Sequence, residues 1–203
     1  MRVDAIALNS SPASEVLQLA ARLSYGLRDS RLVMVCGVQF DQGVAALAIE
    51  LGRCFAMMRS GLVGVLDCER NSLARPEFRS AMQSAGLLNA IRKSENIERV
   101  EQNGTRQSLK LLSLTGQTNL AKDEFVSSDF SAVGVALKQR YELSFLVAEP
   151  LLASSVTPLL AGMVDGVLLA PCAGQDRRDA IAAAINFLEQ VKVRALGTVL
   201  IEP

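Results

Sequence analysis

The chain has 203 residues, half of them hydrophobic, and its 21 basic side chains balance 21 acidic ones. Such a length fits one domain with a core large enough to need no disulfide or metal. The balanced charge argues against a nucleic-acid-binding surface and against a disordered tail. The lack of histidine excludes Ser-His-Asp and Cys-His nucleophilic mechanisms and the commonest nitrogen ligand of zinc.

The amino-terminal sequence MRVDAIALNSSPASE lacks the apolar stretch of a signal peptide. No segment approaches about 18 consecutive apolar residues, so none is expected to insert directly into a membrane. The four cysteines lie far apart and form no C-x-x-C pair. These features predict a cytoplasmic protein with four half-buried free thiols.

Helices and short apolar strands alternate along the chain. A leading helix is expected over 14–27, within a leading segment 1–28, and Ser14 is a candidate N-cap. Apolar residues at helical spacing predict further helices over 43–58, 129–141 and 176–191. Nearly continuous apolar runs, typical of parallel strands covered on both faces, predict strands over 32–36, 62–66, 109–114, 143–148, 166–171 and 195–201.

This alternation predicts an α/β fold, a three-layer sandwich with a mostly parallel central sheet and helices on both faces. Residues 86–128 form the least regular part, where a polar stretch contains the turn pair Asn103-Gly104. No repeat or second domain is evident, so residues 1–203 are expected to form a single domain.

A glycine-containing turn follows the first strand and leads into a helix. Phosphate-binding loops of the type G-x-x-x-x-G-K-[ST] lie at such a place, where backbone N–H groups and a lysine hold the phosphates. The segment VMVCGVQFDQGVAALAIELG resembles the phosphate loop (P-loop) of bacterial tyrosine kinases, relatives of ParA/MinD-type ATPases. On that pattern Gly43 keeps the glycine before the lysine, Val44 replaces the lysine, and Ala45 replaces the magnesium-binding Ser/Thr. Asp41 stands at a loop glycine and Phe40 at a proline.

These replacements predict a site that has lost its affinity for nucleotides. Hydrogen bonds to charged groups contribute about 1.5–3 kcal/mol each, and Asp41 would add a negative charge beside a polyphosphate. No cofactor is therefore expected, with ATP and magnesium bound only if the degenerate site still functions. The alternative interpretation of Val44 and Ala45 is a strand–turn–helix unit whose helix has a buried apolar face.

Two further motifs of the family are altered. In LDCERNSLARPEF, Asp67 matches the first aspartate of a magnesium-assisting motif and Glu69 stands in for the second. Carboxylates at strand ends suit hard cations, so these two are candidate residual metal acids; the alternative is a solvated turn or a helix cap. In YELSFLVAEP, which resembles the Walker B motif, Val147 occupies the aspartate position, and Glu149 is expected past the strand end.

The scaffold segments are the best preserved. VDGVLL at 164–169, the pair Ala173-Gly174 and LGTVL at 196–200 follow the family pattern V-D-G-V-L-L-V-V-x-A-G-x-T…L-G-x-V-L-N, whereas Ile201 or Glu202 takes the final asparagine position. The family's ring-assembly motif E-x-x-R-x-x-R is matched only at Glu15, and autophosphorylation on a tyrosine-rich tail is not expected.

The resemblance covers about residues 14–202 and implies a catalytically degenerate pseudo-ATPase or pseudokinase. It would act as a regulatory or scaffolding partner in exopolysaccharide (capsule-type) biosynthesis and export. Its expected partner is the cytoplasmic face of a membrane polysaccharide chain-length regulator or export complex, which would hold it at the inner face of the cytoplasmic membrane. Homo-oligomerisation stays open, and no nucleic-acid partner is expected.

Two alternatives remain open from the sequence. One is a residual ATPase or tyrosine kinase that uses Asp67, Glu69 or Glu149 as nonstandard metal-binding acids. The other is a localisation scaffold of the ParA/MinD type.

Overall fold

A single seven-stranded sheet forms the centre of the protein. The computed structural model describes residues 14–68, 76–104, 106–117 and 129–202. The strand order is β3-β4-β2-β5-β1-β6-β7, and every neighbouring pair is parallel except β3 with β4. The strands are β1 (Leu32–Cys36), β2 (Val63–Asp67), β3 (Gln102–Asn103), β4 (Leu109–Ser113), β5 (Leu143–Val147), β6 (Gly166–Leu169) and β7 (Ala195–Thr198).

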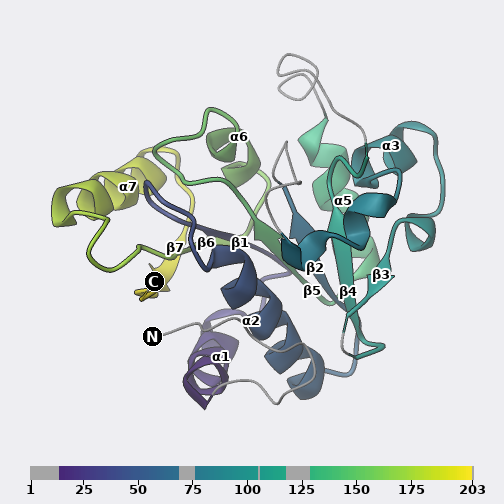
Figure 1. The fold of residues 1–203 in the computed structure, drawn as a ribbon, viewed down its shortest axis with the longest axis horizontal. Helices are drawn as coiled ribbons and strands as arrows, with labels where there is room; N and C mark the ends of the chain where they lie inside the picture. The colour runs from purple at the N-terminus through teal and green to yellow at the C-terminus, as the bar shows by residue number, and fades with distance from the viewer. Residues whose placement is uncertain (1–13, 69–75, 105, 118–128, 203) are drawn as a thin grey trace.

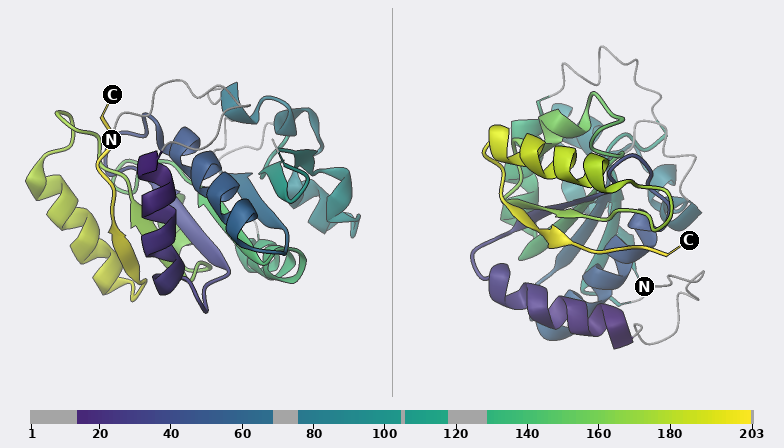
Figure 2. Two further views of the ribbon diagram at one scale, coloured as in Figure 1. Left: turned by 90° about the horizontal axis from the view of Figure 1, so that it is seen from below. Right: turned by 90° about the vertical axis from the view of Figure 1, so that its left-hand side faces the viewer.

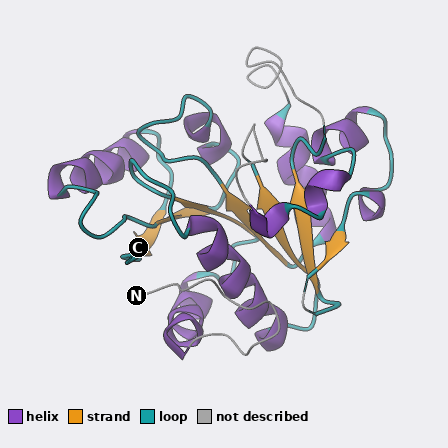
Figure 3. Cartoon of the chain, viewed as in Figure 1, coloured by secondary structure: helices purple, strands orange, loops and turns teal. Residues whose placement is uncertain are grey.

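Helices cover both faces of this sheet, as Figures 1 and 3 show. One face is covered by α1 (Ser14–Gly26) and α2 (Val44–Met58); the other by α3 (Leu87–Arg92), α5 (Phe130–Arg140), α6 (Thr157–Ala161) and α7 (Arg178–Gln190). Short 3-10 helices span Pro76–Phe78, Ala81–Gln83 and Ile97–Arg99. The predicted three-layer α/β sandwich is confirmed.

Each sheet face has its own hydrophobic core. Against α1 and α2, the rings of Phe55 and Phe145 lie 5.6 Å apart between centroids. Against the other helices, Met34 and Leu146 of the sheet pack in one cluster with Leu188 of α7. Burial on both sides explains why the central strands are apolar throughout and do not alternate.

The predicted elements agree with the structure to within one to three residues, except where short elements were missed. No pattern predicted β3, α3 or α6, each of which has six residues or fewer. The turn pair Asn103-Gly104 lies at the β3–β4 connection, where the Gly104 N–H donates to the Leu109 carbonyl. The expectation of half-buried thiols was wrong, because all four cysteines are fully buried and free.

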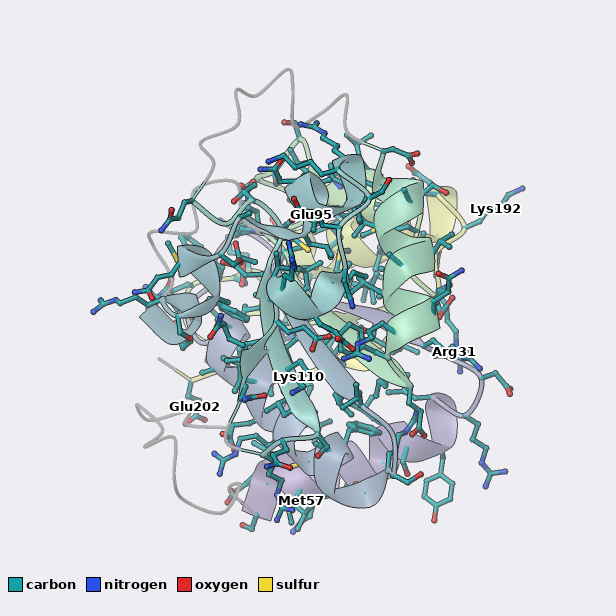
Figure 4. All side chains as sticks on the ribbon, turned by 90° about the vertical axis from the view of Figure 1, so that its right-hand side faces the viewer. Arg31, Met57, Glu95, Lys110, Lys192 and Glu202 are labelled. Atoms are coloured by element: carbon teal, nitrogen blue, oxygen red, sulfur yellow. The ribbon has the colours of Figure 1, made fainter. Side chains whose placement is uncertain are left out.

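The chain reverses sharply between α7 and β7. Lys192 adopts a left-handed backbone conformation there, with φ 58°, and its side chain projects from the surface in Figure 4. The views in Figure 2 show α1 and α7 on opposite sides of the sheet. Within the described residues, no helix has the length and apolar character needed to cross a membrane.

Candidate functional site

The candidate site lies where the parallel strands end. Strand β1 is an inner strand, paired with β5 on one side and β6 on the other. The loop over residues 37–43 leaves its carboxyl end and enters α2. In open α/β sheets, ligands bind outside the carboxyl ends of the strands where the direction of winding reverses. The β1–α2 loop occupies that place here.

Two glycines set the shape of the β1–α2 loop. A Cβ atom at Gly37 would lie 1.6 Å from the Phe40 carbonyl oxygen, so the loop folds back tightly on itself. Gly43 has φ 76° and precedes the first turn of α2 in a left-handed conformation that favours glycine. The chain therefore has a tight strand–turn–helix unit at the place where a phosphate loop would lie.

The residues after Gly43 supply neither a cation nor a hydroxyl group. Val44, at the lysine position, is completely buried in the core between α2 and the sheet, and Ala45 is only 6% exposed. The Val44 N–H donates to the Asp41 carbonyl (3.1 Å), closing a turn. Val44 and Ala45 therefore lie on the buried face of a helix, as the alternative interpretation of the sequence expected.

Neighbouring segments hold the loop from two sides. The N–H groups of Leu151 and Leu152 donate to the carbonyls of Gly37 and Val38, each at 3.0 Å. On another side, a Cβ atom at Gly43 would lie 3.0 Å from Cγ2 of Ile201. Ile201, one of the two candidates for the family's asparagine position, therefore packs an apolar side chain against the loop.

Asp176 is the residue at this site that the sequence reasoning missed. Its Oδ1 accepts a hydrogen bond from the Gln39 N–H of the loop (3.0 Å), and its Oδ2 accepts one from the Cys172 N–H after β6 (2.8 Å). Burial and the Asp176 charge both raise the pKa of the Cys172 thiol. The available signal was an aspartate where the pattern A-G-x-T has threonine.

Asp176 was expected to open the last helix. Instead, α7 begins at Arg178, and its N-cap Arg177 makes no side-chain capping bond. The physical reason is that the Asp176 carboxylate points back to two loop amides, so it is not available to the first turn of α7.

Asp67 is not in a solvated turn, and that interpretation was wrong. It is the last residue of β2, completely buried, and lies in register with Ser113 of β4 and Val147 of β5. Side chains alternate along a strand, so Asp67 faces the α2 side together with Val63 and Val65. Its side chain therefore lies in the layer between the sheet and α2, out of contact with solvent. Its proposed companion, Glu69, lies outside the described residues.

The Walker B position contributes no carboxylate to the site. Val147 is fully buried and pairs with Val35 of β1. Glu149 lies two residues past the end of β5, as expected, and its carbonyl accepts a hydrogen bond from the Thr157 hydroxyl (2.9 Å). Across the described ranges, no three His, Cys, Asp or Glu side chains gather closely enough to hold a metal ion.

The aspartate of the preserved VDG segment has a structural role at the opposite end of the sheet. Asp165 Oδ2 accepts hydrogen bonds from the N–H groups of Arg31 (2.8 Å) and Leu32 (2.9 Å), and Oδ1 contacts Lys138 Nζ at 2.5 Å. Burial alone would raise the pKa of Asp165, but hydrogen bonds from Lys138 and the two amides lower it overall. This carboxylate anchors the start of β1.

The seven-stranded sheet, the central β1–α2 loop and the two helical layers define a P-loop NTPase-like fold. The chain is similar to the kinase domain of VpsO, with 24% identity, 93% of this chain and 96% of that chain covered, and a TM-score of 0.77. It is also similar to the kinase domain of the Escherichia coli tyrosine kinase ETK, with 18% identity, 92% and 74% coverage, and a TM-score of 0.76.

A more distant similarity links the chain to the MinD cell division protein of Aquifex aeolicus, with 16% identity, 85% and 69% coverage, and a TM-score of 0.59. No protein-family model matches the sequence, and the comparison with curated proteins gives no significant match. At these identities the similarity establishes the fold, which is that of bacterial tyrosine-kinase domains and ParA/MinD-type ATPases.

Proposed function

We propose that this protein is a catalytically degenerate P-loop pseudo-ATPase or pseudokinase that acts through its surface as a regulatory or scaffolding partner. The main observation is the buried valine at the lysine position. Val44 is part of the core and its N–H is bonded to Asp41. Neither the side chain nor this amide is available to a phosphate group.

The missing interactions have a large combined effect. A P-loop uses its lysine, its Ser/Thr hydroxyl and a Walker B acid to hold Mg-ATP, and the chain has Val44, Ala45 and Val147 at these positions. Charge-assisted hydrogen bonds contribute about 1.5–3 kcal/mol each, so losing two or three weakens binding by several orders of magnitude. Catalysis by positioning and charge neutralisation would be lost with it.

The biological context follows from the proteins that the chain resembles. Two of the structures similar to this chain are the kinase domains of VpsO and ETK. The family resemblance in the sequence motifs points to exopolysaccharide biosynthesis and export. We infer docking on the cytoplasmic side of a membrane chain-length regulator or export complex, with self-association as an additional mode. Glycosyltransferase and export-channel genes beside this gene would support the assignment; partition or septation genes would contradict it.

Titration of the protein with a fluorescent ATP analogue in the presence of magnesium tests the loss of nucleotide binding. We expect no saturable binding below millimolar concentration. An active P-loop kinase domain measured in parallel controls for the assay. Micromolar affinity for this protein would overturn the proposal.

The position of the Asp67 carboxylate is the one observation that favours a residual ATPase. Its buried carboxylate lies at a strand end on the side covered by α2, where a metal acid would be needed. ATP hydrolysis by the wild type, compared with the double variant Asp67→Ala, Glu69→Ala, distinguishes this alternative. Equal background rates would exclude it, whereas loss of a measurable rate would establish it.

A localisation scaffold of the ParA/MinD type has weaker support. The ParA, MinD and plasmid partition structures align with TM-scores of 0.58 to 0.61, against 0.74 to 0.77 for the kinase domains. Imaging of a fluorescent fusion separates the two: polar or mid-cell oscillation would favour the localisation scaffold.

A further inference from the structure

The carboxylate of Asp176 joins two backbone segments, the β1–α2 loop and the turn after β6. One oxygen accepts from the Gln39 N–H in the β1–α2 loop, and the other accepts from the Cys172 N–H after β6. Both distances, 3.0 Å and 2.8 Å, suit charge-assisted hydrogen bonds between an amide and a carboxylate. The loop thus binds an anion that belongs to the protein itself.

A second contact fixes the same two segments. The Gln175 side-chain amide donates to the Gln42 side-chain oxygen (3.1 Å), one residue before Gly43. Because Gln175 and Asp176 are adjacent, the connection between β6 and α7 contacts the loop at both Gln39 and Gln42. This double attachment makes a local and specific bridge between the two segments.

The charge of Asp176 adds to that of the loop. Asp41 lies two residues from Gln39 and is also acidic. A phosphate group entering the loop at the Gln39 amide would have to displace the Asp176 carboxylate from it and remain beside that negative charge. Opposition of like charges at short range disfavours that exchange.

We propose that Asp176 is an internal anionic ligand of the β1–α2 loop and that it excludes phosphate groups from the loop independently of the missing lysine. This inference deepens the proposed function, on which it rests, by assigning a specific residue to the exclusion of nucleotide. Restoring the lysine and the hydroxyl group alone will therefore not restore phosphate binding.

Amide hydrogen exchange on the full chain tests the bridge without any nucleotide. In Asp176→Ala, exchange at the Gln39 and Cys172 amides should accelerate by about tenfold or more, because each loses a hydrogen bond to a charged acceptor. Asp176→Asn keeps one acceptor oxygen and should protect only one of the two amides. Asp179→Ala is the matched control, since Asp179 forms an exposed pair with Arg177 and accepts a hydrogen bond from the Ala180 amide.

Rescue by a small carboxylate separates an anion-binding role from a general loss of structure. Acetate at tens of millimolar should slow the exchange of the Gln39 amide in Asp176→Ala and leave the wild type and Asp179→Ala unchanged. Unchanged exchange of both amides in Asp176→Ala, or an equal acceleration across the whole sheet, would overturn the bridge.

Pyrophosphate binding then tests exclusion. We expect the variant Val44→Lys, Ala45→Ser to bind pyrophosphate no better than the wild type, and the same variant with Asp176→Thr to bind at least tenfold more tightly. Full binding by the first variant would refute exclusion by Asp176. If the lysine variants fail to fold, pyrophosphate titration of Asp176→Ala decides: slower Gln39 exchange on addition supports exclusion, and no change refutes it. ATP binding by the wild type would refute the pseudokinase function while leaving the exchange result to judge the bridge.

Discussion

Removal of the Asp165 carboxylate should destabilise the protein more than any other single change at the amino end of the sheet. Asp165 belongs to the VDG segment and lies directly before β6. Its Oδ2 accepts from two consecutive amides, Arg31 and Leu32, at the start of β1. Asp165→Ala leaves both amides without this acceptor at the start of β1, an inner strand of the sheet.

The magnitude follows from the three contacts. Leu32 is fully buried, so its unsatisfied N–H costs about 1–3 kcal/mol. The Arg31 amide is at an exposed residue and can be hydrated, so its loss costs about 0.5–1.5 kcal/mol. The pair with Lys138 is partly exposed and adds about 0–1 kcal/mol. We expect Asp165→Ala to lower the free energy of unfolding by about 1.5–5.5 kcal/mol.

Urea denaturation followed by far-UV circular dichroism measures this loss. Lys138→Ala is the matched variant, because it removes the ion pair and leaves both amide contacts in place. We expect it to cost less than about 1 kcal/mol. Since the pKa of Asp165 is lowered in the folded protein, its contribution is present above the ordinary value of 3.8 and is lost as pH falls below it.

Equal losses for the two variants would refute the reasoning, because the ion pair and not the amide contacts would then be responsible. A loss below about 1 kcal/mol for Asp165→Ala would refute it as well. Asp165→Asn should retain most of the stability, since one amide oxygen can still accept from both N–H groups.

Three further outcomes are expected. Phe145→Ala, in the core beneath α2, should lower the free energy of unfolding by about 3–5 kcal/mol in a urea titration. Gly37→Ala should cost about 1–3 kcal/mol in a thermal melt, because its Cβ would lie 1.6 Å from the Phe40 carbonyl oxygen. Burial would raise the pKa of Glu101, but hydrogen bonds from Arg140 and Tyr141 lower it overall, so the stability advantage of the wild type over Glu101→Gln should shrink as pH falls below 4.5.

Each of these three predictions would be contradicted by a specific measurement. A loss below about 1 kcal/mol for Phe145→Ala would mean that the core closes around the vacancy. Gly162→Ala, where the nearest atom is the Leu159 carbonyl oxygen at 3.5 Å, is the control for Gly37, and equal melting temperatures would contradict the tight loop. A pH-independent difference between wild type and Glu101→Gln would contradict the lowered pKa.

The layers of the fold could be predicted from the sequence because the signals are local. The apolar runs at β1 and β5 and the helical spacing in α2 depend only on burial on one or two faces. Short elements such as α3 and α6 could not be predicted, because a helix of five or six residues shows no full hydrophobic period. Their stability comes from packing against α5 and the sheet.

The candidate site, like the fold, could be predicted from the sequence only in part. The residue types at the phosphate-loop positions, including Val44 in place of a lysine, are visible in the sequence. The burial of Asp67 and the contact of Asp176 with the Gln39 amide, 137 residues away in the chain, became visible only when the chain was folded. Burial and hydrogen-bond partners of a polar side chain depend on segments distant in sequence, so a one-dimensional pattern identifies the residue but not the partner it binds.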